Sequence, residues 1–189
     1  MRNPHEEHHP MSELRVHAED QPVPEAVFHD FADIRHELGA IGVNFERWQA
    51  DRVLAVDATP EDVIAAYRGD IDRLMTDYGF GAVDVLRMTP DHPDREALRA
   101  KFLNEHTHTE FEVRFFVEGS GLFYLHTNGR VYAVICEQGD LISVPDGTTH
   151  WFDMGPRPHF TAIRLFTNPE GWVANFTGSD IASRFPRFE

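Results

Sequence analysis

The second half of this chain consists of short apolar runs separated by residues that break regular structure. The runs are rich in Val, Ile, Phe and Tyr and cover residues 113–118, 121–127, 130–136, 140–144 and 160–167. Asn128-Gly129 stands between two of them and is a strong hairpin signal, because a type I′ turn needs positive φ at both central residues. Sequential hairpins favour an antiparallel sandwich or barrel over a parallel sheet. We therefore expect a mainly β fold.

The residues before this β region have the apolar spacing of amphipathic helices. One such stripe runs from Pro24 to Gly39, and another follows Thr59-Pro-Glu-Asp62, which has a capping Thr, a Pro at the first helical position and acidic residues in the first turn. A third helix is indicated from Asp94 to Leu103. At 189 residues the chain can bury one full core. We expect a single domain over residues 25–189, helical over 25–104, with a β core over 105–178 and the helices packed outside it.

Residues 1–24 are polar and contain prolines, and His5, His8 and His9 lie in this segment without periodicity. We expect a partly disordered N-terminus rather than a metal-binding tract, with one short edge strand over residues 14–17.

The charge balance excludes several classes of partner. The formal charge is −15, from 32 acidic and 17 basic residues, so nucleic acid and anionic membrane surfaces would be repelled. The first twenty residues lack an apolar run and no stretch approaches membrane-spanning length, so we expect neither a secretory signal nor a membrane span. The only cysteine, Cys136, cannot form an internal disulfide, and we interpret it as a small buried residue. These features favour the cytoplasm.

Four side chains have the composition of a metal site. His106 and His108 lie on one side of an extended chain, but about 200° apart on a helix, so they share an ion only in extended structure. Glu112 has the same parity, yet a straight strand from His106 to Glu112 would span about 20 Å, so a bend is required near residues 109–110. His150 follows the turn at residues 145–147, which can return a neighbouring strand to the same interior.

Three imidazoles and one carboxylate suit iron, nickel, manganese or zinc, and the absence of thiolates argues against a closed structural zinc site. In an octahedron, four protein ligands leave two adjacent positions for a chelating substrate. The site is therefore arranged for chemistry on a chelating molecule. If that molecule is an anion, its charge needs a nearby cation, and Arg114, two residues beyond Glu112, has the parity to supply it.

These residues match both conserved boxes of the cupin family. The first box is present as His106, His108, Glu112 and Gly119, and the second as Gly139, Pro145, Gly147 and His150, with Met154 where many cupins have asparagine. The resemblance implies a cupin-type antiparallel β-sandwich or barrel, also called a jelly roll.

More narrowly, the chain resembles the acireductone dioxygenase family from about residue 25 onward. The resemblance is carried by the segments 42–48, 102–108, 112–116, 140–145, 150–155, 160–164 and 168–172. It implies an enzyme of methionine salvage that cleaves 1,2-dihydroxy-3-keto-5-methylthiopentene with O₂, uses one Fe(II) or Ni(II) per chain, and works as a monomer. The iron form would give formate and 4-methylthio-2-oxobutanoate, and the nickel form formate, carbon monoxide and 3-methylthiopropanoate.

The resemblance also implies roles for residues beyond the four ligands. It gives Arg114 the task of generating the substrate dianion and Glu105 a part in metal loading, which we weigh against a solvated loop carboxylate. The candidate substrate-binding residues are Phe102, Phe152, Trp172 and Arg164. In place of the acidic residue that relatives commonly have before the ligand glutamate, and that is thought to relay conformational change, this chain has Phe111.

Two other readings remain open at this stage. One is another metal-dependent cupin dioxygenase, or a cupin isomerase, which would turn over without oxygen. The other is a non-catalytic cupin that binds a small molecule. The sequence does not decide between iron and nickel, because both accept these ligands.

Overall fold

The computed structural model describes residues 12–189, so the predictions made for the first eleven residues, including His5, His8 and His9, lie outside the described part. The elements are, in order, β1 (Glu13–Ala18), β2 (Ala26–Phe28), α1 (Phe31–Gly39), β3 (Asn44–Arg47), α2 (Pro60–Ala66), α3 (Arg68–Tyr78), β4 (Ala82–Met88), α4 (Arg95–Phe102), β5 (His106–Thr107), β6 (Glu112–Thr127), β7 (Arg130–Glu137), β8 (Asp140–Val144), β9 (Thr149–Asp153), β10 (Phe160–Phe166), the 3₁₀ helix η1 (Pro169–Trp172), β11 (Asn175–Phe176) and the 3₁₀ helix η2 (Ile181–Arg184).

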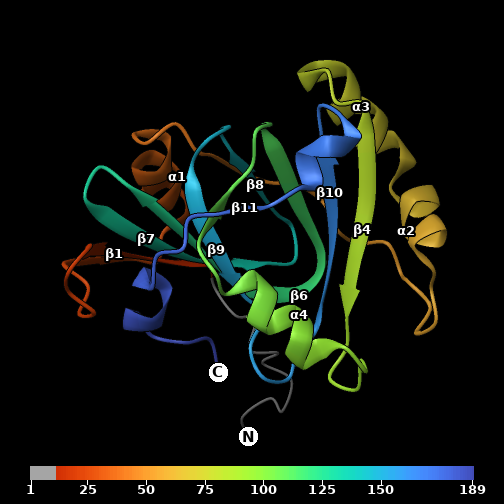
Figure 1. Cartoon of the computed structure of the whole chain (residues 1–189). Helices are drawn as coiled ribbons and strands as arrows, with labels where there is room; N and C mark the ends of the chain where they lie inside the picture. The colour runs from red at the N-terminus through yellow and green to blue at the C-terminus, as the bar shows by residue number, and fades with distance from the viewer. Residues whose placement is uncertain (1–11) are drawn as a thin grey trace, which may run out of the picture.

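Two antiparallel sheets share the long strand β6 (Figure 1). The first sheet has the order β11-β5-β9-β6-β7-β1-β2, and the second has the order β3-β8-β6-β10-β4. The first half of β6 pairs with β8 and β10, whereas its second half pairs with β7 and β9. The strand therefore passes from one sheet to the other and holds the two together.

The transfer between sheets occurs at Gly119-Ser-Gly121, which the sequence predicts to separate two strands. Instead β6 continues through it. Gly119 has φ +66°, and a Cβ atom there would lie 1.8 Å from the carbonyl oxygen of His159. Only glycine fits this backbone conformation and this close approach. The prediction of a break was wrong because the glycines bend the strand without ending it.

The hairpin predicted at Asn128-Gly129 is confirmed. Asn128 and Gly129 have φ +53° and +71°, and Thr127 and Arg130 face each other across the turn. Both values are those that a type I′ turn requires.

The main core lies between the sheets and is apolar on both inner faces. It includes Phe116, Phe123, Ile142 and Phe152, each with no more than 1% of its surface exposed. A second core fills the space between the outer face of the β4–β10–β6 sheet and helices α2 and α3, and a third lies under η2 near the C-terminus.

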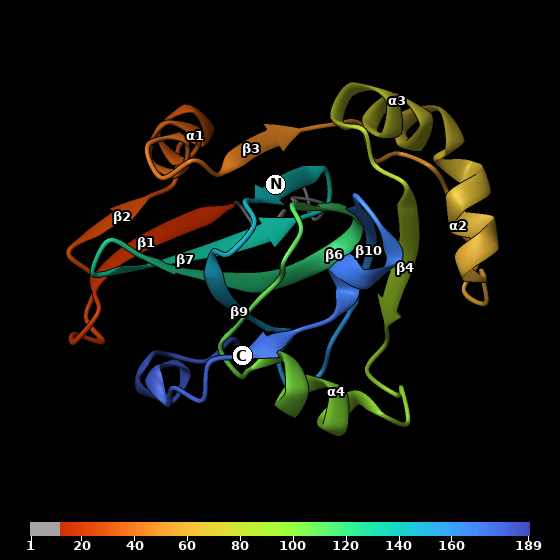
Figure 2. The same cartoon turned by 45° about the horizontal axis from the view of Figure 1, so that its top comes forward.

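Helices α2 and α3 cover the outer face of one sheet, whereas α1 and α4 pack against the main core. Helix α1 contacts β3, α2 contacts β4, and α4 contacts β9 (Figures 1 and 2). The capping Thr predicted at residue 59 is present as part of a capping box, since Thr59 Oγ1 accepts from Asp62 N and Asp62 Oδ2 accepts from Thr59 N. The predicted cupin-type antiparallel β-sandwich with external helices is thus confirmed. Over residues 12–189, no helix combines the length and the apolar composition that a membrane crossing requires.

Several predicted boundaries were wrong. The segment 14–17 belongs to β1, which is an inner strand between β2 and β7 rather than an edge, and Leu14 and Val16 are buried. The first helix begins only at Phe31, because residues 26–28 form β2. The second helix is two helices that meet at Tyr67. Residues 25–104 also contain β3 and β4, so this region is mixed rather than mainly helical. The single-domain division stays a prediction.

Candidate metal centre

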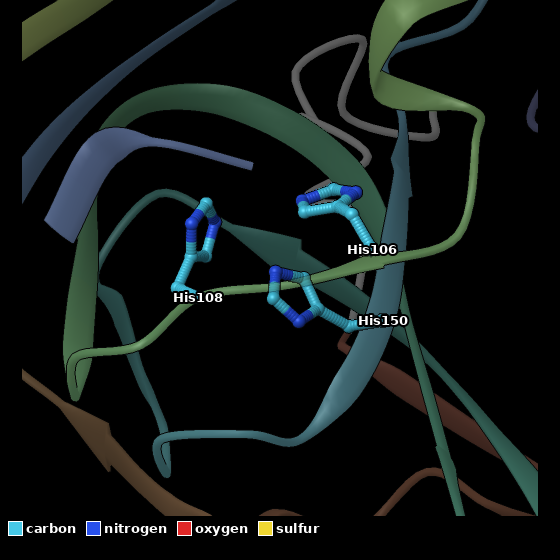
Figure 3. A group of neighbouring side chains, drawn as sticks. All are labelled: His106, His108 and His150. Atoms are coloured by element: carbon cyan, nitrogen blue, oxygen red, sulfur yellow. The ribbon is translucent and has the colours of Figure 1, made fainter. Parts of the chain in front are cut away.

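Three histidines from two neighbouring strands converge on one point. His106 and His150 face each other across the β5–β9 pair, and His108 follows directly after β5. Figure 3 shows the three imidazole rings turned toward a common space. Each offers one nitrogen, and the three nitrogens all lie within 4.8 Å of one another. The predicted bend is present at residues 109–110, between β5 and β6.

The backbone fixes the orientation and the tautomer of each ring. In each case Nδ1 lies within hydrogen-bond distance of a carbonyl oxygen, which only accepts, so Nδ1 carries the proton and donates it. For His106, His108 and His150 the acceptors are the carbonyls of Asn104, Val173 and Thr148, at 2.7, 3.0 and 2.8 Å. The Nε2 lone pair of each ring therefore remains available for a metal ion.

Burial keeps two of the three rings neutral. It lowers the pKa of His106 to about 4 and that of His150 to about 3, despite the opposing influence of the neighbouring backbone carbonyls and of Glu112. Neutral imidazole is the form that binds a metal ion. His106 and His150 are thus in their ligating form at neutral pH without an external base.

Glu112 lies beside the histidines at the start of β6. Its Oε1 accepts a hydrogen bond of 2.9 Å from Arg114 Nε, and its Oε2 is 3.2 Å from His108 Nε2. Burial alone would raise the pKa of Glu112, but the positive charge of Arg114, helped by the nearby histidines, lowers it to about 2. The carboxylate is therefore ionised and has no proton to donate.

The atoms that face the centre are buried and lack protein partners. His108 Nε2, His150 Nε2 and Glu112 Oε2 have no hydrogen-bond partner in the described structure. Two electron-pair donors 3.2 Å apart repel each other unless a cation lies between or beside them. This donor set of nitrogen and carboxylate atoms fits a divalent transition ion.

A pocket of about 270 Å³ opens onto the histidines. It is lined by Leu86, Leu98, Lys101, Phe102, His106, His108, Arg114, Arg164, Trp172, Ala174 and Phe176. Four of the residues predicted from sequence to act on substrate are in this group: Arg114, Phe102, Trp172 and Arg164. Larger hollows elsewhere on the surface, such as the one beside Trp48 and His159, contain none of the predicted site residues.

Arg114 is the most buried cation of the pocket, with 3% of its surface exposed. Its guanidinium lies over the rings of Phe123 and Phe152, at 4.9 and 5.4 Å. Only its Nε is bonded to Glu112, and its two terminal amino groups donate no hydrogen bond within residues 12–189. Arg164, in contrast, forms a two-pronged ion pair with Asp84 of β4.

Phe152 does not line the pocket. It is fully buried in the main core, where it contacts Phe102 and Phe116 and fills the space beside Gly121. The sequence prediction that it contacts substrate is therefore corrected: Phe152 supports the floor beneath Arg114.

Glu105 is not a solvated loop carboxylate. Only 4% of its surface is exposed, and it accepts hydrogen bonds from His126 Nδ1 at 2.7 Å and Thr177 Oγ1 at 2.8 Å. Thr177 N also donates to the Glu105 backbone carbonyl, so Glu105 ties the segment after β11 to the strand that carries His106.

Phe111 occupies the bend before Glu112 and stacks on two other rings. Its centroid lies 5.7 Å from that of Phe80 with nearly parallel planes, and 6.0 Å from that of Tyr78. The stack joins the bend to the turn between α3 and β4. An apolar contact thus fixes the chain directly before the carboxylate of Glu112.

Sequence reasoning missed several residues of the pocket. Leu86 lies on β4, a strand that the sequence analysis did not identify, and Lys101 is an exposed residue on α4. Ala174 and Phe176 belong to a segment with little regular structure, so no periodicity indicates that this segment covers the histidines. Leu98 lies on the helix predicted from Asp94 to Leu103, but was not predicted to line the pocket.

Comparisons with known proteins agree with this geometry. The model of the ARD/ARD' family matches residues 13–174. An acireductone dioxygenase of Marinobacter nauticus is 58% identical over 180 residues, covering 95% of this chain and 97% of its own length. One from Cronobacter sakazakii is 64% identical over 154 residues, covering 82% and 86%.

A solved structure is similar over most of its length. It is an acireductone dioxygenase from Bacillus anthracis with a cadmium ion in its active centre, 29% identical, with a TM-score of 0.76 and coverage of 88% of this chain and 98% of that one. In that protein, a divalent ion therefore occupies the active centre.

Proposed function

Because the chain belongs to the ARD/ARD' family, we propose that it is a metal-dependent dioxygenase that cleaves 1,2-dihydroxy-3-keto-5-methylthiopentene, an acireductone, with O₂ in methionine salvage. With iron the products are formate and 4-methylthio-2-oxobutanoate. With nickel they are formate, carbon monoxide and 3-methylthiopropanoate. The observation that carries the proposal is the convergence of three buried imidazoles at the base of a pocket that also contains a buried arginine.

We propose His106, His108, His150 and Glu112 as the ligands of one Fe(II) or Ni(II). Support comes from the orphaned Nε2 and Oε2 atoms and from the carbonyl contacts that fix the three rings. When bound, the ion supplies Lewis acidity that lowers the pKa of a chelated enediol. The absence of cysteine among these ligands leaves the centre without the closed thiolate shell of structural zinc sites.

Arg114 supplies the charge that a dianionic substrate requires. A divalent ion and Glu112 sum to one positive charge, so a dianion would leave a net negative charge in a pocket of low dielectric constant. Arg114 is held in place by Glu112 and by two aromatic faces, while its terminal amino groups remain free to donate to substrate oxygens. Such a preorganised donor stabilises charge as the hydroxyl groups lose their protons.

The rest of the pocket suits the apolar part of this substrate. Leu86, Leu98, Phe102 and Trp172 line it opposite the polar base. Apolar walls exclude water and bind a methylthio tail through burial of apolar surface. We assign the methylthio tail of the substrate to these apolar residues.

We further propose that the protein acts as a monomer in the cytoplasm. Its single cysteine, Cys136, is fully buried in β7, which is compatible with a reducing compartment. Light scattering should give the 21.7 kDa of one chain, and a mass twice as large would contradict the monomer.

The decisive experiment loads metal-free protein separately with Fe(II) and Ni(II), adds acireductone under O₂, and measures O₂ uptake, formate, keto acid and carbon monoxide. Both forms should consume O₂, and only the nickel form should release carbon monoxide. His150→Ala serves as the control and should bind substantially less metal. Protein that retains its ion by elemental analysis yet consumes no O₂ would contradict the function, and full metal content in His150→Ala would contradict the ligand assignment.

A further inference from the structure

The pocket is lined by cations and by no carboxylate. Arg114, Arg164 and Lys101 contribute to its wall, while no Asp or Glu of residues 12–189 is among the residues that line it. This is unusual for a chain whose formal charge is −15. A cationic pocket in an acidic protein concentrates anions locally and repels cations.

Two of these three cations already have acidic partners. Arg114 is bonded to Glu112, and Arg164 is paired with Asp84. Lys101, in contrast, is in none of the ion pairs formed within residues 12–189. Among the residues that the structure describes, it is therefore the pocket cation without an acidic partner.

Lys101 lies where an incoming molecule would meet it first. It is exposed and belongs to the last turn of α4, next to Phe102, whereas His106, His108 and Arg114 are buried at the base. The exposed parts of Trp172 and Phe176, 37% and 51% of their surfaces, mark the same outer rim. Lys101 is also the only lysine in the chain, the other 16 basic residues being arginines.

We propose that Lys101 is a specificity-determining residue that receives the anionic enediolate at the mouth of the pocket and favours it over neutral analogues. The inference rests on the proposed function, because it takes the substrate to arrive as a singly ionised enediolate that loses its second proton at the base of the pocket. A lysine suits this step, since its hydrated point charge on a flexible stem attracts an anion without the fixed two-pronged grip of arginine. Arg114 then holds the oxygens at the base.

Kinetics on matched variants test the proposal. Lys101→Met removes the charge and keeps the length of the side chain, Lys101→Arg keeps the charge, and Arg95→Met changes the net charge equally on the same helix but outside the pocket. Lys101→Met should raise KM about tenfold, equivalent to about 1.4 kcal/mol, with kcat within about twofold. It should also weaken the dependence of kcat/KM on ionic strength, whereas Lys101→Arg and Arg95→Met should behave as the parent.

A lysine at the end of a helix also interacts favourably with the helix dipole. If Lys101 had that role alone, Lys101→Met would lower the midpoint of thermal unfolding and leave KM unchanged. An unchanged KM in Lys101→Met, or an equal rise in Arg95→Met, would overturn the proposal.

Chemical labelling provides a readout that is independent of turnover. Because the chain has one lysine, an amine-selective reagent modifies only Lys101 and the α-amino group, and peptide mass spectrometry separates the two. In metal-loaded protein, oxalate, an unreactive chelating dianion, should protect Lys101 and leave the α-amino group reactive. Equal labelling of Lys101 with and without oxalate would refute the role of Lys101, even in an active enzyme. If oxalate protects Lys101 from labelling but the enzyme consumes no O₂, the proposed reaction is refuted, while Lys101 is still an anion-binding residue.

Discussion

The burial of His150 predicts how the metal-free protein responds to acid. The His150 pKa is about 3 in the folded chain, whereas an imidazole in an unfolded chain has a pKa of about 6.5. Below pH 6.5 the unfolded chain therefore binds a proton that the folded chain does not, and the free energy of unfolding falls as the pH falls. At pH 5, which is about 1.5 pH units below the pKa in the unfolded chain, the free energy of unfolding is lower by about 2 kcal/mol, because each pH unit contributes about 1.36 kcal/mol.

The measurement is urea unfolding in the presence of a chelator at pH 7 and pH 5. His106 and His17 are also buried with lowered pKa values, so they add losses of the same sign to the wild-type protein. The variant His150→Gln isolates the contribution of His150. Between pH 7 and pH 5, its free energy of unfolding should fall by about 2 kcal/mol less than that of the wild-type protein. The lowered pKa of Glu112 changes stability only below about pH 4.5, outside this window.

A control removes an imidazole that the fold does not bury. His36 is exposed on α1, and His36→Gln should lose as much stability between pH 7 and pH 5 as the wild-type protein does. If His150→Gln shows the wild-type loss to within about 0.5 kcal/mol, His150 is not held neutral in the folded chain, and the argument for a preformed ligand fails.

Three further variants probe the centre and its support. Arg114→Met should retain metal by elemental analysis and lose turnover about 100-fold or more, because a buried donor to the developing charge is gone; normal rates would remove Arg114 from the mechanism. Phe111→Ala should lower the free energy of unfolding by about 2 kcal/mol through loss of the stack with Phe80 and Tyr78, and a change below about 0.5 kcal/mol in urea unfolding would show that the stack contributes little. Gly119→Ala should cost about 3 kcal/mol or more in the same assay, whereas Gly129→Ala, also at positive φ but with open space around it, should cost only about 1 kcal/mol; equal losses would contradict the close approach to His159.

The site was more predictable from sequence than the fold around it. The parity of His106 and His108 and the length of a straight strand to Glu112 were enough to require a bend, which is present at residues 109–110. These arguments succeed because they depend on local geometry that all extended chains share. Likewise, Asn128-Gly129 specifies its turn through local backbone preferences.

The sequence predictions fail where the structure depends on pairing between strands that are distant in sequence. Residues 82–88 form β4 because all seven pair with β10. Their own sequence contains no turn signal that would predict a strand here, as Asn128-Gly129 does for its hairpin. Phe152 was a candidate pocket residue, yet its ring enters the main core, where it packs beside Gly121. Which face a residue joins depends on the partner strands, and these lie far away in sequence.

The shared strand β6 has a consequence for the order of events in a newly made chain. Glu112 is in the half of β6 that pairs with β8 and β10, whereas His106 and His150 belong to β5 and β9 in the other sheet. A half-formed molecule with only one sheet would present the histidines or the carboxylate, never both. All four proposed ligands can therefore surround one divalent ion only after both sheets have formed, so the complete centre comes last in assembly.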